Sequence, residues 1–217
     1  MRAAQIVALM FALVLSPEAL AGKKKSNKIP EIQKTGISEF DPTFMDVKSI
    51  HDDLDTIRSA LKSGNQNLAT ALDMPRETSL DESLAELKKR ANNKINYTLE
   101  NGAWPKLKAT DAVPSDVQAG IDAVNNLVDS IKTSSETLAA MPAKAKELGI
   151  TAAAFPADLN LDLLTKNNLT MDKLPTIAKK LKNNAKAIKA TPERIERVTD
   201  QTVNMASKVT AAFPKGS

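Results

Sequence analysis

The chain has 217 residues, with 30 Lys and Arg against 26 Asp and Glu, no cysteine, one histidine and one tryptophan. Without cysteine there can be no disulfide framework, thiol nucleophile or thiolate metal site. A single histidine also argues against the common zinc and iron sites, which use several. These counts exclude classes of function and identify none.

Residues 1–21 have the three-part layout of a secretory signal peptide. Arg2 precedes an apolar run over residues 3–15, and a pattern of small residues ends at Ala21, after which we expect cleavage. A permanent membrane anchor needs about 18 or more apolar residues, and this run breaks at Ser16. The sequence therefore predicts an exported protein, periplasmic or extracellular.

The mature chain is expected to be soluble and basic. Cleavage removes one basic and one acidic residue, Arg2 and Glu18, so the net charge stays at +4. No later stretch is long enough to span a bilayer. Residues 22–40 are expected to form a flexible basic leader, because four lysines fall between Gly22 and Lys28 and chain termini are usually poorly ordered.

The first strong helix is predicted to start at Asp41-Pro42, an N-cap residue followed by a proline in the first turn. Its apolar residues recur every three or four positions and share one narrow stripe: Val47, Ile50, Leu54, Ile57 and Leu61. Gly64 is the expected stop. The pattern leaves open whether Asn65 to Asp73 restarts a helix or forms a turn.

A second helix is predicted from Ser79, which forms a capping box with Glu82. Its apolar positions, Leu80, Leu84, Leu87 and Ala91, have helical spacing, and Asn92-Asn93 ends it.

From Lys94 the pattern changes to a period of two, which predicts a small β-hairpin at about residues 94–109. Asn101-Gly102 is a strong hairpin-turn signal, and Pro105 restricts the second strand to a sheet edge. Since a lone hairpin is marginally stable, it should pack on helices, with Trp104 as the expected anchor.

The longest predicted helix follows Pro114 and has a heptad-like seam. The seam comprises Val117, Ile121, Val124, Val128, Ile131 and Leu138. Pro142 is expected to kink or restart this helix, and Gly149 to end it. Residues 150–168 fit both strand and helix periods, so the pattern does not decide between them.

Two further helices are predicted, one opening at Pro175 and one at Thr191-Pro192, where a cap is again followed by proline. The expected fold is all-α, a helical bundle of five or six helices with the one small hairpin. Residues 41–214 have a suitable length for a single domain.

The sequence offers no strong candidate for chemistry. His51 and Asp55 share one side of the first helix, and we interpret them as a surface pair rather than a metal or catalytic site, because no second histidine exists. No catalytic residue, metal site or cofactor is expected. Asn96 and Asn168 begin glycosylation sequons, whose use depends on the organism.

The most informative surface lies on the helix 175–190. Its residues Lys179, Lys182, Lys186 and Lys189 fall within an arc of about 80° at 100° per residue, and no acid occurs between Asp172 and Glu193. This face could contact an anionic lipid or polymer surface, although a solvated outer face is the simpler interpretation. Nucleic acid is not expected, because no aromatic residues lie among the lysines for base stacking.

Two hypotheses follow. The favoured one is an exported, non-enzymatic helical bundle with an interaction or envelope-associated structural role, acting on a protein partner or by self-association. The alternative is a binder or carrier of lipid or other anionic amphiphiles through the basic helix 175–190.

Overall fold

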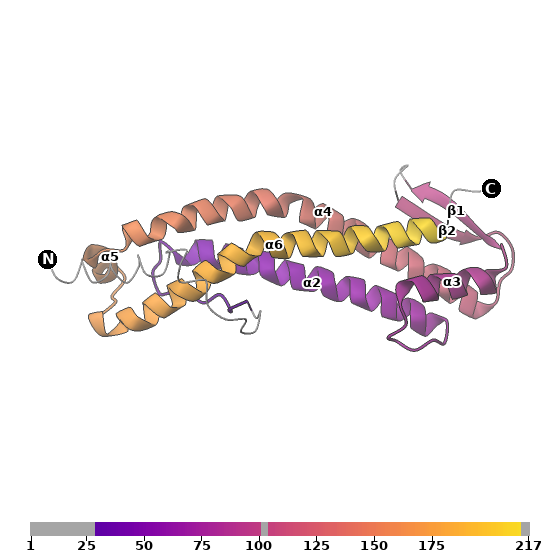
Figure 1. The fold of residues 1–217 in the computed structure, drawn as a ribbon, viewed down its shortest axis with the longest axis horizontal. Helices are drawn as coiled ribbons and strands as arrows, with labels where there is room; N and C mark the ends of the chain where they lie inside the picture. The colour runs from indigo at the N-terminus through magenta and orange to yellow at the C-terminus, as the bar shows by residue number, and fades with distance from the viewer. Residues whose placement is uncertain (1–28, 101–103, 214–217) are drawn as a thin grey trace. The chain divides into compact units, whose positions relative to one another are not determined.

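The structure, a computed structural model, describes residues 29–100 and 104–213. The predicted signal peptide and most of the basic lysines of the leader therefore lie outside the described residues. Within the described part, the chain forms five α-helices and one two-stranded hairpin (Figure 1). The prediction of a largely helical protein with one small β-hairpin is confirmed. None of these helices is long and apolar enough to cross a membrane.

The chain divides into two compact units, and three long helices contribute to both. The first unit comprises residues up to Asp52 and Met141–Arg194, and the second comprises Asp53–Ala140 and the residues from Ile195 onward. The long helices are α2 (Asp41–Ala71), α4 (Ser115–Asp158) and α6 (Leu174–Ala212). The single domain expected over residues 41–214 stays a prediction.

The first unit contains the start of α2, the end of α4 and the first half of α6. Phe155 stacks on Phe40 with ring centroids 4.1 Å apart and meets Phe44 edge-on at 5.4 Å. The short helices α5 (Leu161–Lys166) and η2 (Met171–Lys173) connect α4 to α6. Residues 150–168, which the sequence pattern left undecided, are therefore mostly helical.

Several residues within the segment expected to form the flexible leader, residues 22–40, are buried. Ile32, Ile37 and Phe40 are buried. Asp41, the expected N-cap of α2, instead accepts hydrogen bonds from the Thr35 amide (2.6 Å), the Thr35 hydroxyl (2.7 Å) and the Gly36 amide (3.1 Å). The carboxylate thus holds the turn that precedes the helix.

The second unit adds α3 (Leu80–Ala91), β1 (Ile95–Glu100) and β2 (Trp104–Ala109) to the other halves of the long helices. The Ser79 capping box is confirmed, with both reciprocal hydrogen bonds present, and α3 ends at Asn92 in the left-handed conformation. The strands pair antiparallel with Tyr97 opposite Leu107. The alternation of half-buried and exposed residues along β1 also matches the prediction.

Leu107, rather than the expected Trp104, attaches the hairpin to the helices. Leu107 is 1% exposed, whereas Trp104 is only half-buried. The Asn125 carboxamide on α4 accepts from the Leu107 amide at 2.9 Å and donates to the Leu107 carbonyl at 3.0 Å. Leu107 is therefore held both by burial of its side chain and by two hydrogen bonds between its backbone and Asn125.

The helix ends predicted at Gly64 and Gly149 and the helix start predicted at Thr191-Pro192 are wrong, and the helix does not restart at Pro142, where a kink or a restart was expected. Helix α2 continues through Gly64, α4 continues through Pro142 and Gly149, and α6 continues through Pro192. A proline inside a helix removes a backbone hydrogen bond, at a cost of about 3 kcal/mol. Burial of apolar residues on both sides of each proline offsets that cost: Leu138, Met141 and Ala145 in α4, and Ala187, Ile195 and Val198 in α6.

Gly64 and Gly120 occur where helices approach closely. A Cβ atom at Gly64 would lie 2.7 Å from Leu127 Cδ1, and one at Gly120 would lie 2.8 Å from Leu87 Cδ1. These glycines provide space between helices instead of ending them.

Candidate functional site

The first half of α6 has one buried stripe that determines which side chains face outward. Ile177, Leu181, Asn184, Ala187 and Thr191 are buried, and their spacing of four, three, three and four residues places them along one side of the helix. This side packs within the first unit. The residues on the opposite side of the helix are left for solvent or a partner.

The four lysines singled out by the sequence, Lys179, Lys182, Lys186 and Lys189, are all exposed. On a helical projection their arc lies opposite the centre of the buried stripe. At 1.5 Å per residue they extend along about 15 Å of the helix. The structure thus brings all four onto one exposed face, which we call the lysine face.

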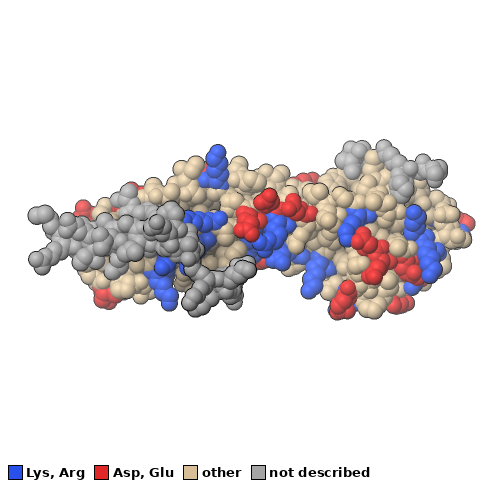
Figure 2. Space-filling view, viewed as in Figure 1, with Lys and Arg blue, Asp and Glu red and all other residues tan. Residues whose placement is uncertain are grey.

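The charge of this segment has one sign over a long stretch. Between Asp172 and Glu193 the chain contains six lysines and no acid. On the side of the molecule seen in Figure 2, by contrast, basic and acidic side chains are interspersed. A stretch of like charge on one face raises the local potential and concentrates anions near it.

Two hydrogen-bonded contacts hold this segment against the residues that precede α2. The Asn184 carboxamide accepts from the Gln33 amide at 3.0 Å and donates to the Gln33 carbonyl at 2.8 Å, and Lys180 Nζ donates to the Lys34 carbonyl at 2.8 Å. Asn184 is fully buried. Its role was not predicted from the sequence, although a polar residue three positions after Leu181 in the apolar stripe is a usable signal.

His51 was expected on the surface of the first helix, but it is buried. It is 7% exposed, and its Nε2 lies 2.9 Å from the Thr191 hydroxyl oxygen. That hydroxyl donates to the Ala187 carbonyl at 2.9 Å, so the imidazole Nε2 carries the hydrogen of the contact. The side chain links α2 to α6 within the first unit. The predicted pairing of His51 with Asp55 stays a prediction.

Two clusters of charged side chains connect elements within a unit. In the first unit, hydrogen bonds from Lys166, Asn167 and Ser38 lower the pKa of Glu39 to about 2. In the second, Arg90 on α3 donates to Glu86 at 2.8 Å and to Asp116 on α4 at 2.9 Å. The guanidinium lowers the pKa of both carboxyl groups. Both clusters therefore favour ionised carboxylates.

The part of the chain that the structure describes brings no three His, Asp or Glu side chains close enough together to hold a metal ion. Asn96 and Asn168, which begin the two sequons, are both exposed. Their glycosylation stays a prediction.

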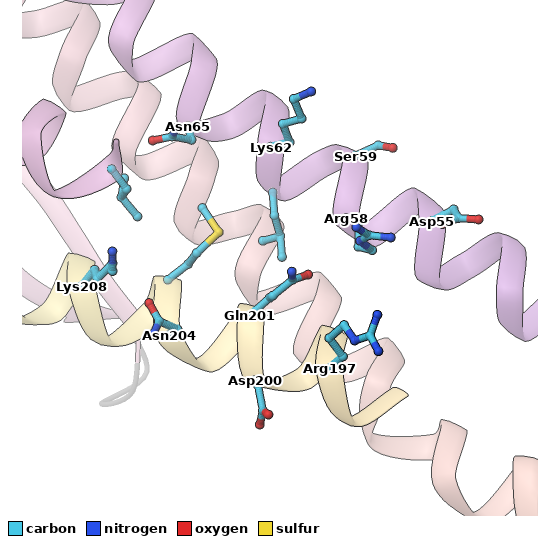
Figure 3. Close-up of a pocket in the computed structure, with 13 residues that line it drawn as sticks. Asp55, Arg58, Ser59, Lys62, Asn65, Arg197, Asp200, Gln201, Asn204 and Lys208 are labelled. Carbon is cyan, nitrogen blue, oxygen red and sulfur yellow. The ribbon is translucent and has the colours of Figure 1, made fainter. Parts of the chain in front are cut away.

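A groove that was not predicted from the sequence lies in the second unit, between α2 and α6 (Figure 3). Its volume is about 740 Å³, and its lining includes Arg58 and Lys62 from α2, and Arg197, Met205 and Lys208 from α6. None of the four lysines of the lysine face lines it. Residues from three separate segments, α2, α6 and the start of α3, form this groove, so periodicity within one helix could not reveal it.

Comparisons of the chain with models of protein families, with curated proteins and with solved structures gave no match.

Proposed function

We propose that this protein is an exported, non-enzymatic helical protein that acts by binding, and that the lysine face of α6 is its contact with an anionic surface. The observation that carries the proposal is the exposure of Lys179, Lys182, Lys186 and Lys189 on the side of the helix opposite its buried stripe. A lysine close to an anionic membrane contributes about 1 kcal/mol to binding. Four acting together therefore give substantial affinity without any apolar insertion.

The attachment of this segment supports binding to a surface. The buried Asn184 carboxamide holds the helix to the Gln33 backbone through two hydrogen bonds. Because the buried stripe is already used in packing, the lysine face can contact a surface without unfolding the helix. The polar residue that a catalytic role would most readily have used, His51, is buried in a contact between helices.

The alternative, that the same helix carries a bound amphiphile, has less support than contact with a surface. A carrier needs an apolar groove next to the charged residues, because most of a bound small molecule is buried. The groove in the second unit is lined by other residues, and Ile177 and Leu181 are buried in the first unit. We therefore favour contact with a surface over uptake of its components.

The experiment that tests the proposal is co-sedimentation with phosphatidylglycerol vesicles and with phosphatidylcholine vesicles, each at low and high salt. We expect binding to the anionic vesicles alone, and weaker binding at high salt because ions screen the attraction. Replacing Lys179, Lys182, Lys186 and Lys189 by Ser removes about 4 kcal/mol, so the affinity should fall by roughly two to three powers of ten.

A matched control replaces four exposed lysines of the second unit by Ser: Lys62, Lys88, Lys89 and Lys108. This variant has the same net charge as the first but an intact lysine face. If both variants lose affinity equally, binding depends on net charge alone and the proposed face is wrong. Failure of the unmodified protein to bind anionic vesicles at low salt would also reject it.

A further inference from the structure

The groove of the second unit continues along α6 beyond the part between α2 and α6. A second hollow of about 520 Å³ lies between α6 and α3, and the two hollows share Asn204 and Lys208 in their lining. Together they follow one side of α6 from Arg197 to Ala212. At 1.5 Å per residue this distance is about 22 Å, or four helical turns.

The groove is apolar at its base and basic along its sides. Leu61, Leu80 and Met205 line the first hollow, and Leu84 lines the second. In the first hollow four cationic residues face two acidic ones. Figure 3 shows Arg58 and Arg197 extending from opposite helices toward the space between them, while Asp200 extends away from it.

The basic residues are distributed over the whole length of the groove. Arg197 lies at one end, Arg58 and Lys62 along the α2 side, Lys208 where the two hollows meet, and Lys88 at the α3 side of the second hollow. Lys208 also pairs with Asp81 at the start of α3. A ligand that matches this pattern has negative charges along its length and apolar groups between them.

This pattern discriminates among occupants. A fatty acid has its charge at one end, whereas the basic residues of this groove are distributed over several helical turns. An amphipathic helix of about 15 residues spans the groove, with apolar residues toward the base and acidic residues on both flanks.

We propose that this groove binds an acidic amphipathic helix of a partner protein. The inference is independent of the lysine face, because the groove belongs to the second unit and the lysine face to the first. Apolar residues at positions i, i+3 or i+4, and i+7 of the partner would contact Leu61, Leu80 and Met205. Its Glu or Asp residues would pair with Arg58, which extends toward α6, and with Lys62 at the outer edge of the groove, because Lys62 extends away from α6 in Figure 3.

The probe is a fluorescent synthetic helix of about 15 residues, with leucines in one stripe and glutamates on both flanks. Its binding to the full chain is measured by fluorescence anisotropy at low and high salt. The control peptide has lysines in place of the glutamates. We expect salt-sensitive binding of the glutamate peptide alone. Binding of neither peptide, or equal binding of both, would overturn the proposal.

Two variants locate the binding site. Met205→Trp fills the groove, whereas Val203→Trp adds the same ring to a position 57% exposed and about 160° away around the helix. Met205→Trp should weaken binding roughly tenfold or more, as expected for a central contact, and Val203→Trp should not. Equal loss in both would place the site elsewhere.

Charge reversal at exposed positions tests the electrostatic part of the binding without changing the packing of the core. Arg58→Glu with Lys62→Glu should reduce the affinity roughly tenfold or more, while Lys108→Glu on the hairpin should change it little. Competition by laurate is measured in parallel. If laurate displaces the peptide and charge reversal leaves binding unchanged, the proposal of a partner helix is wrong and the groove binds an amphiphile instead.

Discussion

Three glycines within helices allow a graded test of how closely the helices pack. In an α-helix, alanine is favoured over glycine by about 1 kcal/mol, and this gain applies at Gly64, Gly120 and Gly149. The sites differ in the space available for the added methyl group. At Gly149 the nearest atom to a new Cβ, Ile188 Cγ2, is 4.0 Å away, which is an ordinary contact.

Gly149→Ala should therefore raise the free energy of unfolding by about 1 kcal/mol, or the melting temperature by roughly 2–4 °C for a chain of this size. At Gly120 the new Cβ would lie 2.8 Å from Leu87 Cδ1 and 3.1 Å from Leu72 Cδ2. Both leucines are fully buried. Overpacking of this kind costs about 1–3 kcal/mol, so Gly120→Ala should be neutral to destabilising by about 2 kcal/mol.

Urea unfolding followed by far-UV circular dichroism measures these differences. Gly64→Ala, whose Cβ would lie 2.7 Å from Leu127 Cδ1, should behave like Gly120→Ala. The double variant Gly120→Ala with Leu87→Val relieves the contact, so its destabilisation should be smaller than the sum of the two single effects. If Gly120→Ala stabilises the protein as much as Gly149→Ala, or if the double variant is additive, the proposed close approach is refuted.

Three other predictions concern individual contacts. Thr191→Val removes the hydroxyl that contacts the buried His51 Nε2 and should lower the free energy of unfolding by about 1–3 kcal/mol. Thr202→Val, which removes a hydroxyl bonded within its own helix, should lower it by less. Equal decreases in the free energy of unfolding would contradict the role of His51. Leu107→Ala should cost about 2–5 kcal/mol and Trp104→Ala clearly less, as measured by urea unfolding; the reverse order would restore tryptophan as the hairpin anchor. The pKa of Glu39 is lowered from 4.5 to about 2, so its stabilising contribution is complete above pH 4.5 and is lost as the pH falls toward 2. The melting temperature of Glu39→Gln should therefore vary less over that pH range than the melting temperature of the unmodified protein. Identical pH profiles of the two melting temperatures would argue against the cluster.

The lysine face was predictable from the sequence because it depends on one helix alone. The residue spacing determines which side chains share a side of a helix. The apolar residues Ile177 and Leu181 indicate the side that is buried. The structure adds Asn184 as the polar residue that holds the segment in place. A polar residue within an apolar stripe shows that a partner must exist, but the sequence does not identify it.

Local patterns also determined the capping box at Ser79, the end of α3 and the hairpin that follows. Each depends on hydrogen bonds among residues only a few positions apart, so the residue types are sufficient. The seam of α4 was predictable for a related reason, since Val117, Ile121 and Val124 repeat with the helical period and are all buried.

Tertiary structure decided where the long helices end, how His51 is used and where the groove lies. Gly64, Pro142 and Pro192 favour helix ends only slightly, by a few kcal/mol at most. Burial of apolar residues on both sides contributes a comparable or larger amount, and the sequence does not show which neighbour buries them. His51 joins Thr191, 140 positions away, and the groove joins α2 to α6. The sequence alone determined which side of each helix is apolar, while packing between distant segments decided which of its polar and small residues are buried and which line a surface.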